Sequence, residues 1–460
     1  MIKKYIGNKA FYKTALAVAM PMMIQNAITN FVSLLDNIMV GRLGTVEMSG
    51  VSIVNQLLFV FNLCIFGAVA GPGIFTAQFA GSGDNDGVRH TFRFKLIICL
   101  IISALGVGVL STFGEPLIGL YLNGEGSAAE IAATLTNAKA YLKIMVIGFI
   151  PFAISNAYAS TMRETGQTVV PMASGIAAVG VNLSLNYVLI FGKLGAPALG
   201  VQGAAIATVI SRFAELLINA IWLHTHRKRY PYIKGAFRSL KIPKKLAGSI
   251  CIKGLPLLVN EALWSLGMAT LSQCYSTRGI TVVAATNISN TIWNLFSVSF
   301  LSLGNAVGII IGQMLGAGKT NDEVRDTNRK LIAFSVVSCV IFGSVMAAFS
   351  GLFPQIYNTT PEVRLMATRL ICISAVIMPF NAYTNSAYFT LRSGGKTVIT
   401  FIFDSCFVWI ICVPIAFCLS RFTQMPILLL YTVTQGIEIL KSALGGYMLK
   451  RGDWLQNLTL

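Results

Sequence analysis

The long apolar stretches of this chain contain very few ionisable side chains, and its chemistry must come from them. A charge near the middle of a bilayer costs at least ~2.5–3.5 kcal/mol, so each of these residues is a candidate for function by default. The set consists of Asp36, Arg212, Glu215, Glu261, Asp404 and Glu438. The carboxylates among them could carry a proton or hold a cation.

Asp36 is predicted to lie at the same depth in the membrane as three neutral side chains whose oxygen atoms can bind a cation. At ~1.5 Å per residue, Asp36 lies about 33 Å along the stretch that begins near residue 14 on the cytoplasmic side. Asn182 and Asn186 lie about 21–27 Å along another rising stretch, on one helical face, and Thr208 lies about 12 Å below the outer surface. Hard cations prefer oxygen ligands, so Asp36, Asn182 and Asn186 would suit Na⁺, and Asp36 alone would suit a titrating proton. The alternative is structural, with Asp36 capping a helix end and the asparagines joining helices.

A second group of candidates lies in the C-terminal part of the chain. Glu261 lies about 20 Å along its helix, near the membrane centre and one turn before Trp264. A carboxylate and an aromatic ring in this arrangement could hold a lipophilic cation by charge and cation–π attraction. Asp404, about 9 Å along a later helix, is a further candidate for a substrate site or a second proton site.

The other charges in the apolar stretches are predicted to pair within their own helices. Opposite charges three residues apart lie on one helical face and stabilise each other. This spacing joins Arg212 to Glu215 and Glu438 to Lys441. We expect a structural role for both pairs.

The elements that must position these residues are membrane-spanning helices. The composition is 55% hydrophobic and 11% charged, whereas soluble domains carry roughly 25% charged residues. Apolar stretches of ~20 residues or more can each cross roughly 30 Å of hydrocarbon, and backbone in lipid must satisfy its own hydrogen bonds by forming helices. We expect about twelve, at roughly 14–38, 52–80, 94–114, 138–161, 168–191, 200–223, 248–275, 284–312, 331–353, 366–390, 398–420 and 425–448.

The net charge of +18 is distributed as in a membrane protein. Lysine and arginine gather at the N-terminus and in every second loop, above all between Arg227 and Lys253. This alternation is the positive-inside pattern, and it predicts a multi-pass protein of the inner (plasma) membrane with both termini in the cytoplasm. Membrane insertion and contact with anionic lipid explain the basic loop, so we expect no nucleic-acid partner.

The chain repeats itself, and the repeat defines its domains. A shift of 235 residues places Pro21 on Pro256, Gly44 on Gly279, Gln78 on Gln313 and Gly81 on Gly316. Six helices per half return the chain to the same side, so the halves are parallel, as in one class of transporters. We predict an all-α polytopic fold of two pseudo-symmetric six-helix lobes, 1–226 and 248–460, joined by a cytoplasmic linker, 227–247.

Other kinds of chemistry find no support in the sequence. The nine cysteines include no C-x-x-C motif and have no histidine at metal spacing, so they resemble small apolar residues. The ATP-binding motif G-x-x-x-x-G-K-[S/T] is absent, and so is the dense His, Asp or Ser constellation of a membrane-embedded enzyme. A channel would more often be a symmetric oligomer. We expect a transporter, with no catalytic residues and no cofactor.

Several motifs, taken in their order and spacing, resemble the multidrug and toxic compound extrusion (MATE) family. They are Pro21 followed fifteen residues later by Asp36, Gln78-x-x-Gly81-x-Gly83, Arg163-x-x-Gly166-x-Thr168, the segment Gly200 to Thr208, and Gln313-x-x-Gly316-x-Gly318. The resemblance covers essentially the whole chain. It implies a MATE-like fold of two lobes around a cleft.

The resemblance also implies a function. It is that of an antiporter, driven by H⁺ or Na⁺, which exports amphipathic drugs, mainly organic cations, by alternating access between the lobes. Asp36 would be the coupling site, Pro21 would let the first helix bend, and Glu261 would serve coupling or substrate binding. Three further residues would complete the cation site, namely Asn182, Asn186 and Thr208. A flippase of lipid-linked oligosaccharide or another lipid, from the same superfamily, is the alternative; it would usually show more arginine in its cleft.

Two departures from the family pattern leave the coupling ion open. Asn186 stands where the best-described sites have aspartate, so the local charge is lower. The stretch from Pro379 to Leu391 contains no acid, whereas one Na⁺-driven branch has an aspartate there. We keep both H⁺ and Na⁺ as candidates, and we expect a monomer whose other partners are small-molecule drugs and membrane lipids.

Overall fold

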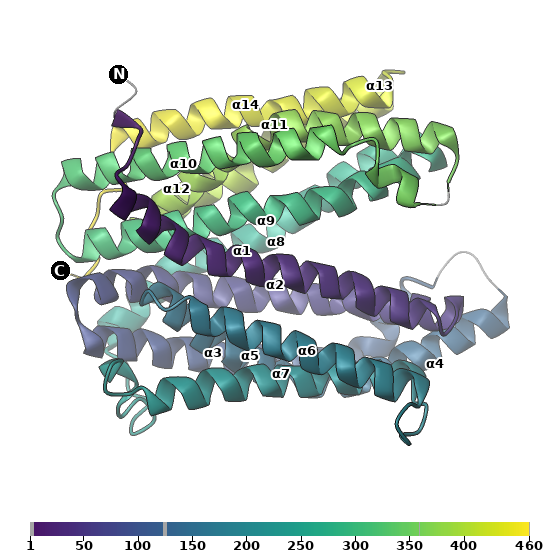
Figure 1. The fold of residues 1–460 in the computed structure, drawn as a ribbon, viewed down its shortest axis with the longest axis horizontal. Coiled ribbons are helices and arrows are strands. Elements are labelled where there is room, and N and C mark those ends of the chain that lie inside the picture. Colours follow the sequence, from purple (N-terminus) through teal and green to yellow (C-terminus); the bar gives the residue numbers. More distant parts are fainter. Residues whose placement is uncertain (1–3, 123–126, 358, 460) are drawn as a thin grey trace. The chain divides into compact units, whose positions relative to one another are not determined.

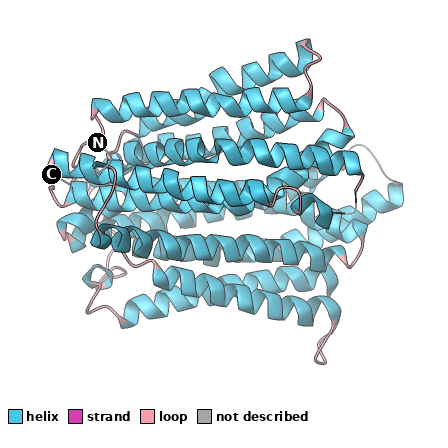
Figure 2. Cartoon of the chain, turned by 45° about the horizontal axis from the view of Figure 1, so that its top comes forward, coloured by secondary structure: helices cyan, strands magenta, loops and turns pink. Residues whose placement is uncertain are grey.

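A computed structural model describes residues 4–122, 127–357 and 359–459. This described part is built from helices and short loops and contains no β-strand (Figure 2). Within it, twelve helical segments are long and apolar enough to cross a membrane. The predicted all-α polytopic fold is confirmed, and most helices extend several residues beyond the apolar stretches.

The helices of the first repeat are α1 (Lys9–Gly41), α2 (Thr45–Ser82), α3 (Asn85–Gly119), α4 (Ala128–Met145), η2 (Val146–Gly148), α5 (Phe149–Glu164), α6 (Val169–Phe191) and α7 (Gly200–Thr225), followed by η3 (Pro231–Ile233). Those of the second are α8 (Lys244–Ser276), α9 (Ile280–Gly316), α10 (Asn321–Ala348), η4 (Phe353–Ile356), α11 (Pro361–Ser393), α12 (Thr397–Phe401), η5 (Ile402–Cys406), η6 (Val408–Cys412), α13 (Val413–Phe422) and α14 (Ile427–Arg451). The segments η5 and η6 are π-helical. Together α4, η2 and α5 form one span, and α12 to α13 form another.

Polar residues explain where two of these helices begin. Thr320 accepts a hydrogen bond from the amide of Glu323, whose side chain bonds back to Thr320, so α10 begins with a capping box. Ser127 and Glu130 form the same arrangement at the start of α4. These caps satisfy amide groups that would otherwise lack partners at the helix ends.

Packing divides the chain into two compact units. The N-terminal unit comprises Ile24–Thr76 and Asn85–Ser249, and the C-terminal unit comprises Met1–Met23, Ala77–Asp84 and Ile250–Leu460. The beginning of α1 and the end of α2 therefore pack with the second repeat. The chain passes from one unit to the other inside both helices.

In the C-terminal unit, α11 packs against α9, α10 and α14 (Figure 1). A large apolar cluster joins α9, α11 and α14 to α8 and α13 through buried residues such as Leu271, Leu370 and Leu430. A second cluster surrounds Phe403 and Trp454. Since Trp454 is only 1% exposed, the segment after α14 is part of the packed core.

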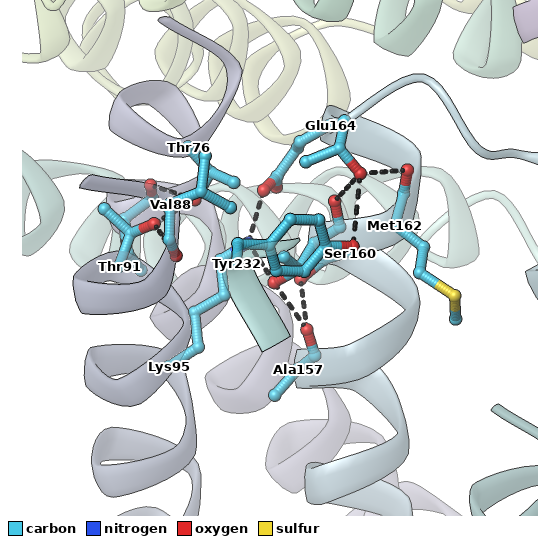
Figure 3. A network of polar contacts seen from close by, with 12 residues as sticks. Thr76, Val88, Thr91, Lys95, Ala157, Ser160, Met162, Glu164 and Tyr232 are labelled. Atoms are coloured by element: carbon cyan, nitrogen blue, oxygen red, sulfur yellow. Dashed lines mark hydrogen bonds and ion pairs between the residues drawn. The ribbon is translucent and has the colours of Figure 1, made fainter. Parts of the chain in front are cut away.

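In the N-terminal unit, α7 packs against α4, α5 and α6, and α3 packs against α5. Lys95 of α3 forms an ion pair with Glu164 at the end of α5 and donates to Thr161 at 3.2 Å (Figure 3). A Cβ on Gly73 would lie 2.4 Å from the Glu164 carboxylate, so α2 reaches the pair because this residue has no side chain. The buried pair thus joins three helices.

The repeated Q-x-x-G-x-G motifs meet where α2 crosses α9. A Cβ on Gly81 would lie 1.9 Å from the carbonyl oxygen of Gln313, and a Cβ on Gly316 would lie 1.8 Å from that of Gln78. The repeat relates these two contacts to each other. Any side chain would push the two backbones apart, so both positions need glycine. The Gln78 side chain also donates to the Gln456 carbonyl at 3.1 Å and so holds the C-terminal segment.

Gly81→Ala and Gly316→Ala are each expected to lower the melting temperature in detergent. Overpacking typically costs ~1–3 kcal/mol, and here the obstacle is backbone that cannot turn aside. Gly436→Ala, in α14, is the control because a Cβ there meets nothing within 4 Å. Alanine should be neutral or slightly stabilising at that position. Equal losses in all three variants would show that the crossing does not require glycine.

Candidate functional site

The N-terminal candidates come from three helices of one unit, with Asp36 on α1, Asn182 and Asn186 on α6, and Thr208 on α7. The helix α6 ends where Gly192 adopts a left-handed conformation, with φ of 64°. Gly203 then lets α7 approach α6 closely, because a Cβ there would lie 2.6 Å from the Leu189 carbonyl oxygen. The asparagines are thereby held against Thr208.

The four side chains form one hydrogen-bonded cluster, which we call the Asp36 cluster. Asn186 Nδ2 donates to Asp36 Oδ1 at 2.7 Å and to Asn182 Oδ1 at 3.1 Å. Asn182 Nδ2 donates to Thr208 Oγ1 at 3.3 Å. With its amide turned over, Asn182 would instead donate to both carboxylate oxygens of Asp36, at 3.0 and 3.1 Å. In both orientations, the structure brings the predicted residues together.

The Asp36 cluster has oxygen atoms available for a cation. Asn182 and Asn186 are 6% and 1% exposed, and Asp36 is half-buried. Asn186 Oδ1 is buried and accepts no hydrogen bond from the described residues. No lysine or arginine in the described ranges forms an ion pair with Asp36. A carboxylate beside an unused amide oxygen fits Na⁺, and the carboxylate alone fits a proton.

In the second repeat, apolar and aromatic residues occupy the equivalent positions. Local shifts that place Gly44 on Gly279, Arg163 on Arg392 and Glu215 on Glu438 give the four equivalents Leu271, Ile411, Ile415 and Tyr431. All four belong to the large apolar cluster of the C-terminal unit or pack against it. The second repeat therefore uses this region as core, and the polar arrangement belongs to the first repeat alone.

Asn260 of α8 is the centre of a different polar network in the C-terminal unit. Its Nδ2 donates to Asp404 Oδ2 at 3.0 Å, and its Oδ1 accepts from the Ser405 hydroxyl at 2.7 Å. Asp404 also forms an ion pair with Lys441 of α14, whose Nζ lies 2.8 Å from Oδ1. The side chains of Lys441 and Asp404 are only 7% and 16% exposed. In contrast to Asp36, Asp404 has a resident cation.

Glu261 joins this network through Tyr388 of α11. The Tyr388 hydroxyl donates to Glu261 Oε1 at 3.4 Å and accepts from Asn260 Nδ2 at 3.4 Å. Trp264, one turn after Glu261, is 37% exposed and lies outside the network. The structure therefore connects Glu261 with Asp404.

The sequence did not identify Asn260, Ser405 and Tyr388 as members of this network, and it predicted Glu438 rather than Asp404 as the partner of Lys441. The position of Asn260 offered a signal, since it precedes Glu261 and its repeat equivalent, Gln25, is also an amide. Tyr388 and Lys441 lie on helices far along the chain, so no local pattern connects them with Asn260 or Asp404.

The expected intrahelical pairs differ from the contacts observed. Lys441 pairs with Asp404, whereas Glu438 accepts from the Thr384 hydroxyl at 3.2 Å. The π segments η5 and η6 change which face of the helix each residue presents, and regular helical spacing does not anticipate this. Arg212 likewise donates to the Gly148 carbonyl at 3.3 Å and lies over an aromatic ring of α5.

Pro21 is buried within α1, which continues as a helix on both sides of it. Proline lacks the backbone donor, so the hydrogen-bond ladder of α1 is interrupted at this point. The boundary between the packing units falls between Met23 and Ile24. The weakened turn therefore lies where α1 passes from one unit to the other.

Comparisons with known proteins agree with this architecture. The chain is 25% identical over 452 residues to the probable multidrug resistance protein NorM of Thermotoga maritima, covering 97% of this chain and 94% of that protein. It is 27% identical over 419 residues to the probable multidrug resistance protein YoeA of Bacillus subtilis, covering 89% and 87% of the two chains. A solved structure, the outward-facing conformation of a multidrug resistance MATE family transporter of the MOP superfamily, superposes with a TM-score of 0.85 at 18% identity, covering 98% of each chain.

The family model described as MatE matches this chain twice, at residues 21–188 and 256–418. The two matches fall in the two repeats and together cover more than half of the chain. They include Asp36 in the first repeat and Glu261 with Asp404 in the second. The chain therefore belongs to the MatE family.

Proposed function

We propose that this chain is a cation-coupled antiporter that exports amphipathic drugs, mainly organic cations, through a membrane crossed by the twelve apolar spans of its described residues. The observation that carries the proposal is the Asp36 cluster, a carboxylate within a span that has neutral oxygen neighbours and no ion-pair partner among the described residues. The names of the relatives, which are called multidrug resistance proteins, support drugs as the substrates. No catalytic chemistry is part of this proposal.

Asp36 is the proposed coupling residue, for either H⁺ or Na⁺. An ion that binds the Asp36 cluster neutralises its charge, and Na⁺ would also use the free Asn186 Oδ1. Bound and unbound states of the unit then differ in charge. The ion can then shift the balance between two conformations to the extent that it binds one of them more tightly.

Glu261 and Trp264 are the proposed seat for the substrate cation. The Tyr388 hydroxyl donates one long hydrogen bond, of 3.4 Å, to the Glu261 carboxylate, and the indole of Trp264 is partly exposed. Charge and cation–π attraction would then act on a lipophilic cation together. Asp404 is proposed as a second proton site; protonation there would release Lys441, so this role requires their ion pair to open.

Alternating access is proposed to come from movement of lobe 1–226 against lobe 248–460 about the linker 227–247. Support comes from the two helices that pass between the packing units. Each contains a proline shortly before the passage, Pro21 in α1 and Pro72 in α2. Because proline weakens the helical ladder, these are the turns at which the helices can bend most easily.

We propose that the protein is a monomer. We also propose that it lies in the inner membrane with both termini in the cytoplasm. The support is the alternation of basic loops along the chain. Membrane lipids would then contact the basic linker from the cytoplasmic side.

Efflux from proteoliposomes tests the proposed function. Purified protein is reconstituted with a fluorescent organic cation, and efflux is recorded under an imposed pH gradient, an imposed Na⁺ gradient, both, or neither. We expect efflux under at least one gradient and none without. An efflux rate that is the same with and without the gradients would contradict ion coupling. The rates under the pH gradient alone and under the Na⁺ gradient alone identify the ion.

Glu261→Gln is expected to weaken export of cationic substrates more than export of neutral ones. Loss of one counter-charge in a partly desolvated site costs ~1–3 kcal/mol, or about 5-fold to 150-fold in affinity. Initial export rates for matched cationic and neutral dyes would be compared in the same vesicles. Trp264→Phe keeps an aromatic ring and should have the smaller effect. An equal loss for both dye classes would remove the proposed role of Glu261 as a counter-charge.

A further inference from the structure

The basic loop after α7 is tied to the body of the N-terminal unit by Arg93 of α3. The Arg93 guanidinium donates to the carbonyl oxygens of Gly235 and Ala236, both at 2.8 Å, and to that of Lys241 at 3.2 Å. Arg93 is itself buried, at 7% exposure. Three charge-assisted bonds from one buried side chain hold the loop in a defined shape.

The beginning of the loop is held in the same way. Arg89 donates to the Tyr232 carbonyl oxygen at 3.0 Å, and the Tyr232 hydroxyl lies 3.4 Å from that of Thr165. Figure 3 shows Tyr232 beside Glu164 and Ser160 of α5. Burial raises the pKa of Tyr232 well above its usual value, so its hydroxyl stays protonated. The loop is therefore a docked part of the unit.

The docked loop and the end of α7 form a pocket of about 360 Å³, which we call the linker pocket. Arg227, Lys234 and Arg238 line it, together with His224 and Phe237. The His224 and Phe237 rings stack with their centroids 5.7 Å apart. The pocket thus combines three cationic side chains with the stacked rings of His224 and Phe237.

No carboxylate in the described ranges pairs with the cationic side chains of the linker pocket. None of Arg227, Lys234 and Arg238 takes part in an ion pair there. The sequence contains no acidic residue between Glu215 and Glu261. Three like charges held around one cavity repel each other, so an anion that enters it is stabilised by all three.

Two exposed apolar side chains belong to the same loop. Phe237 and Leu240 are 56% and 60% exposed. Exposed apolar side chains beside lysine and arginine are typical of segments at a membrane surface, where the charges meet lipid headgroups.

We propose that the linker pocket binds a phosphate-bearing anion, either the headgroup of an anionic phospholipid or a soluble phosphate. Arginine and lysine are the side chains that bind phosphate oxygens most strongly. With the orientation proposed above, the pocket faces the cytoplasmic headgroup layer. The binding chemistry does not depend on that orientation, nor on drug export, so its test is separate from that of the proposed function.

The test uses the full-length protein purified in a neutral detergent. Three probes are titrated while thermal stability is recorded: dihexanoyl phosphatidylglycerol, dihexanoyl phosphatidylcholine and inorganic phosphate. The pocket variant is Arg227→Gln/Lys234→Gln/Arg238→Gln. The matched control is Lys228→Gln/Lys241→Gln/Lys244→Gln, which removes the same charge from exposed positions outside the pocket. Size-exclusion profiles confirm that both variants are folded.

We expect saturable binding of an anionic probe to the wild type, with an affinity that falls about tenfold or more in the pocket variant and less than about twofold in the control. Saturation by phosphatidylglycerol alone identifies a lipid headgroup, and saturation by inorganic phosphate identifies a soluble source. Equal losses in the two variants would overturn the proposal, because diffuse charge would then explain binding. Equal affinity for phosphatidylcholine and phosphatidylglycerol, or no saturable binding of any probe, would overturn it as well.

Discussion

Asp36→Asn is expected to reduce gradient-driven export to the rate of protein-free vesicles while leaving the protein folded. The asparagine side chain has the same shape, and its oxygen can still accept the 2.7 Å hydrogen bond from Asn186 Nδ2. What it loses is the negative charge, so it can neither take up a proton nor neutralise Na⁺. Efflux from proteoliposomes under the effective gradient measures the loss, and the melting temperature in detergent measures the fold.

The control for Asp36→Asn is Glu115→Gln, the same chemical change in the same unit. Glu115 is 55% exposed and pairs with Lys139 at 2.6 Å. Exposed pairs of this kind contribute ~0–1 kcal/mol, so export should remain at the wild-type rate. Undiminished efflux by Asp36→Asn would remove the coupling role of the Asp36 cluster. A large fall in melting temperature would show instead that Asp36 is a structural residue.

Lys441→Met is expected to destabilise the C-terminal unit strongly. It leaves the Asp404 carboxylate, which is only 16% exposed, without its cation. Removing one partner of a buried pair costs ~3–5 kcal/mol, because the remaining charge stays desolvated. Unfolding in mixed detergent and dodecyl sulfate gives the free energy of each variant.

The double variant Lys441→Met/Asp404→Asn separates the pair from the packing around it. Asparagine at position 404 can still accept from Asn260, so most of the lost stability should return. Lys139→Met is the exposed control and should change the free energy of unfolding by ~0–1 kcal/mol. If the double variant is as unstable as Lys441→Met alone, lost packing of the lysine stem explains the effect, and the charge pair does not.

The spans and the repeat could be predicted because their signals are local. A stretch of apolar residues identifies a span wherever it packs, and Pro21, Gly81 and Gly316 recur or stand at positions where the backbone needs them. The Asp36 cluster could be anticipated from depth along straight helices, since Asn182 and Asn186 share a face. The side-chain partners of Asp404 in the C-terminal unit could not be predicted in this way, because η5 and η6 depart from regular helical geometry.

By itself, the sequence determined an all-α membrane protein of two related halves and showed that Asp36 and Glu261 have no acidic equivalent in the other half. Only the tertiary structure decided which of those carboxylates has a counter-charge. Asp36 meets amides and a hydroxyl, whereas Asp404 meets Lys441. The reason is physical: hydropathy follows from each residue and its neighbours, but charge compensation depends on the rotation and approach of helices far apart in the chain. The first repeat therefore has an embedded carboxylate without an ion-pair partner among the described residues, and the second has one that its own lysine neutralises.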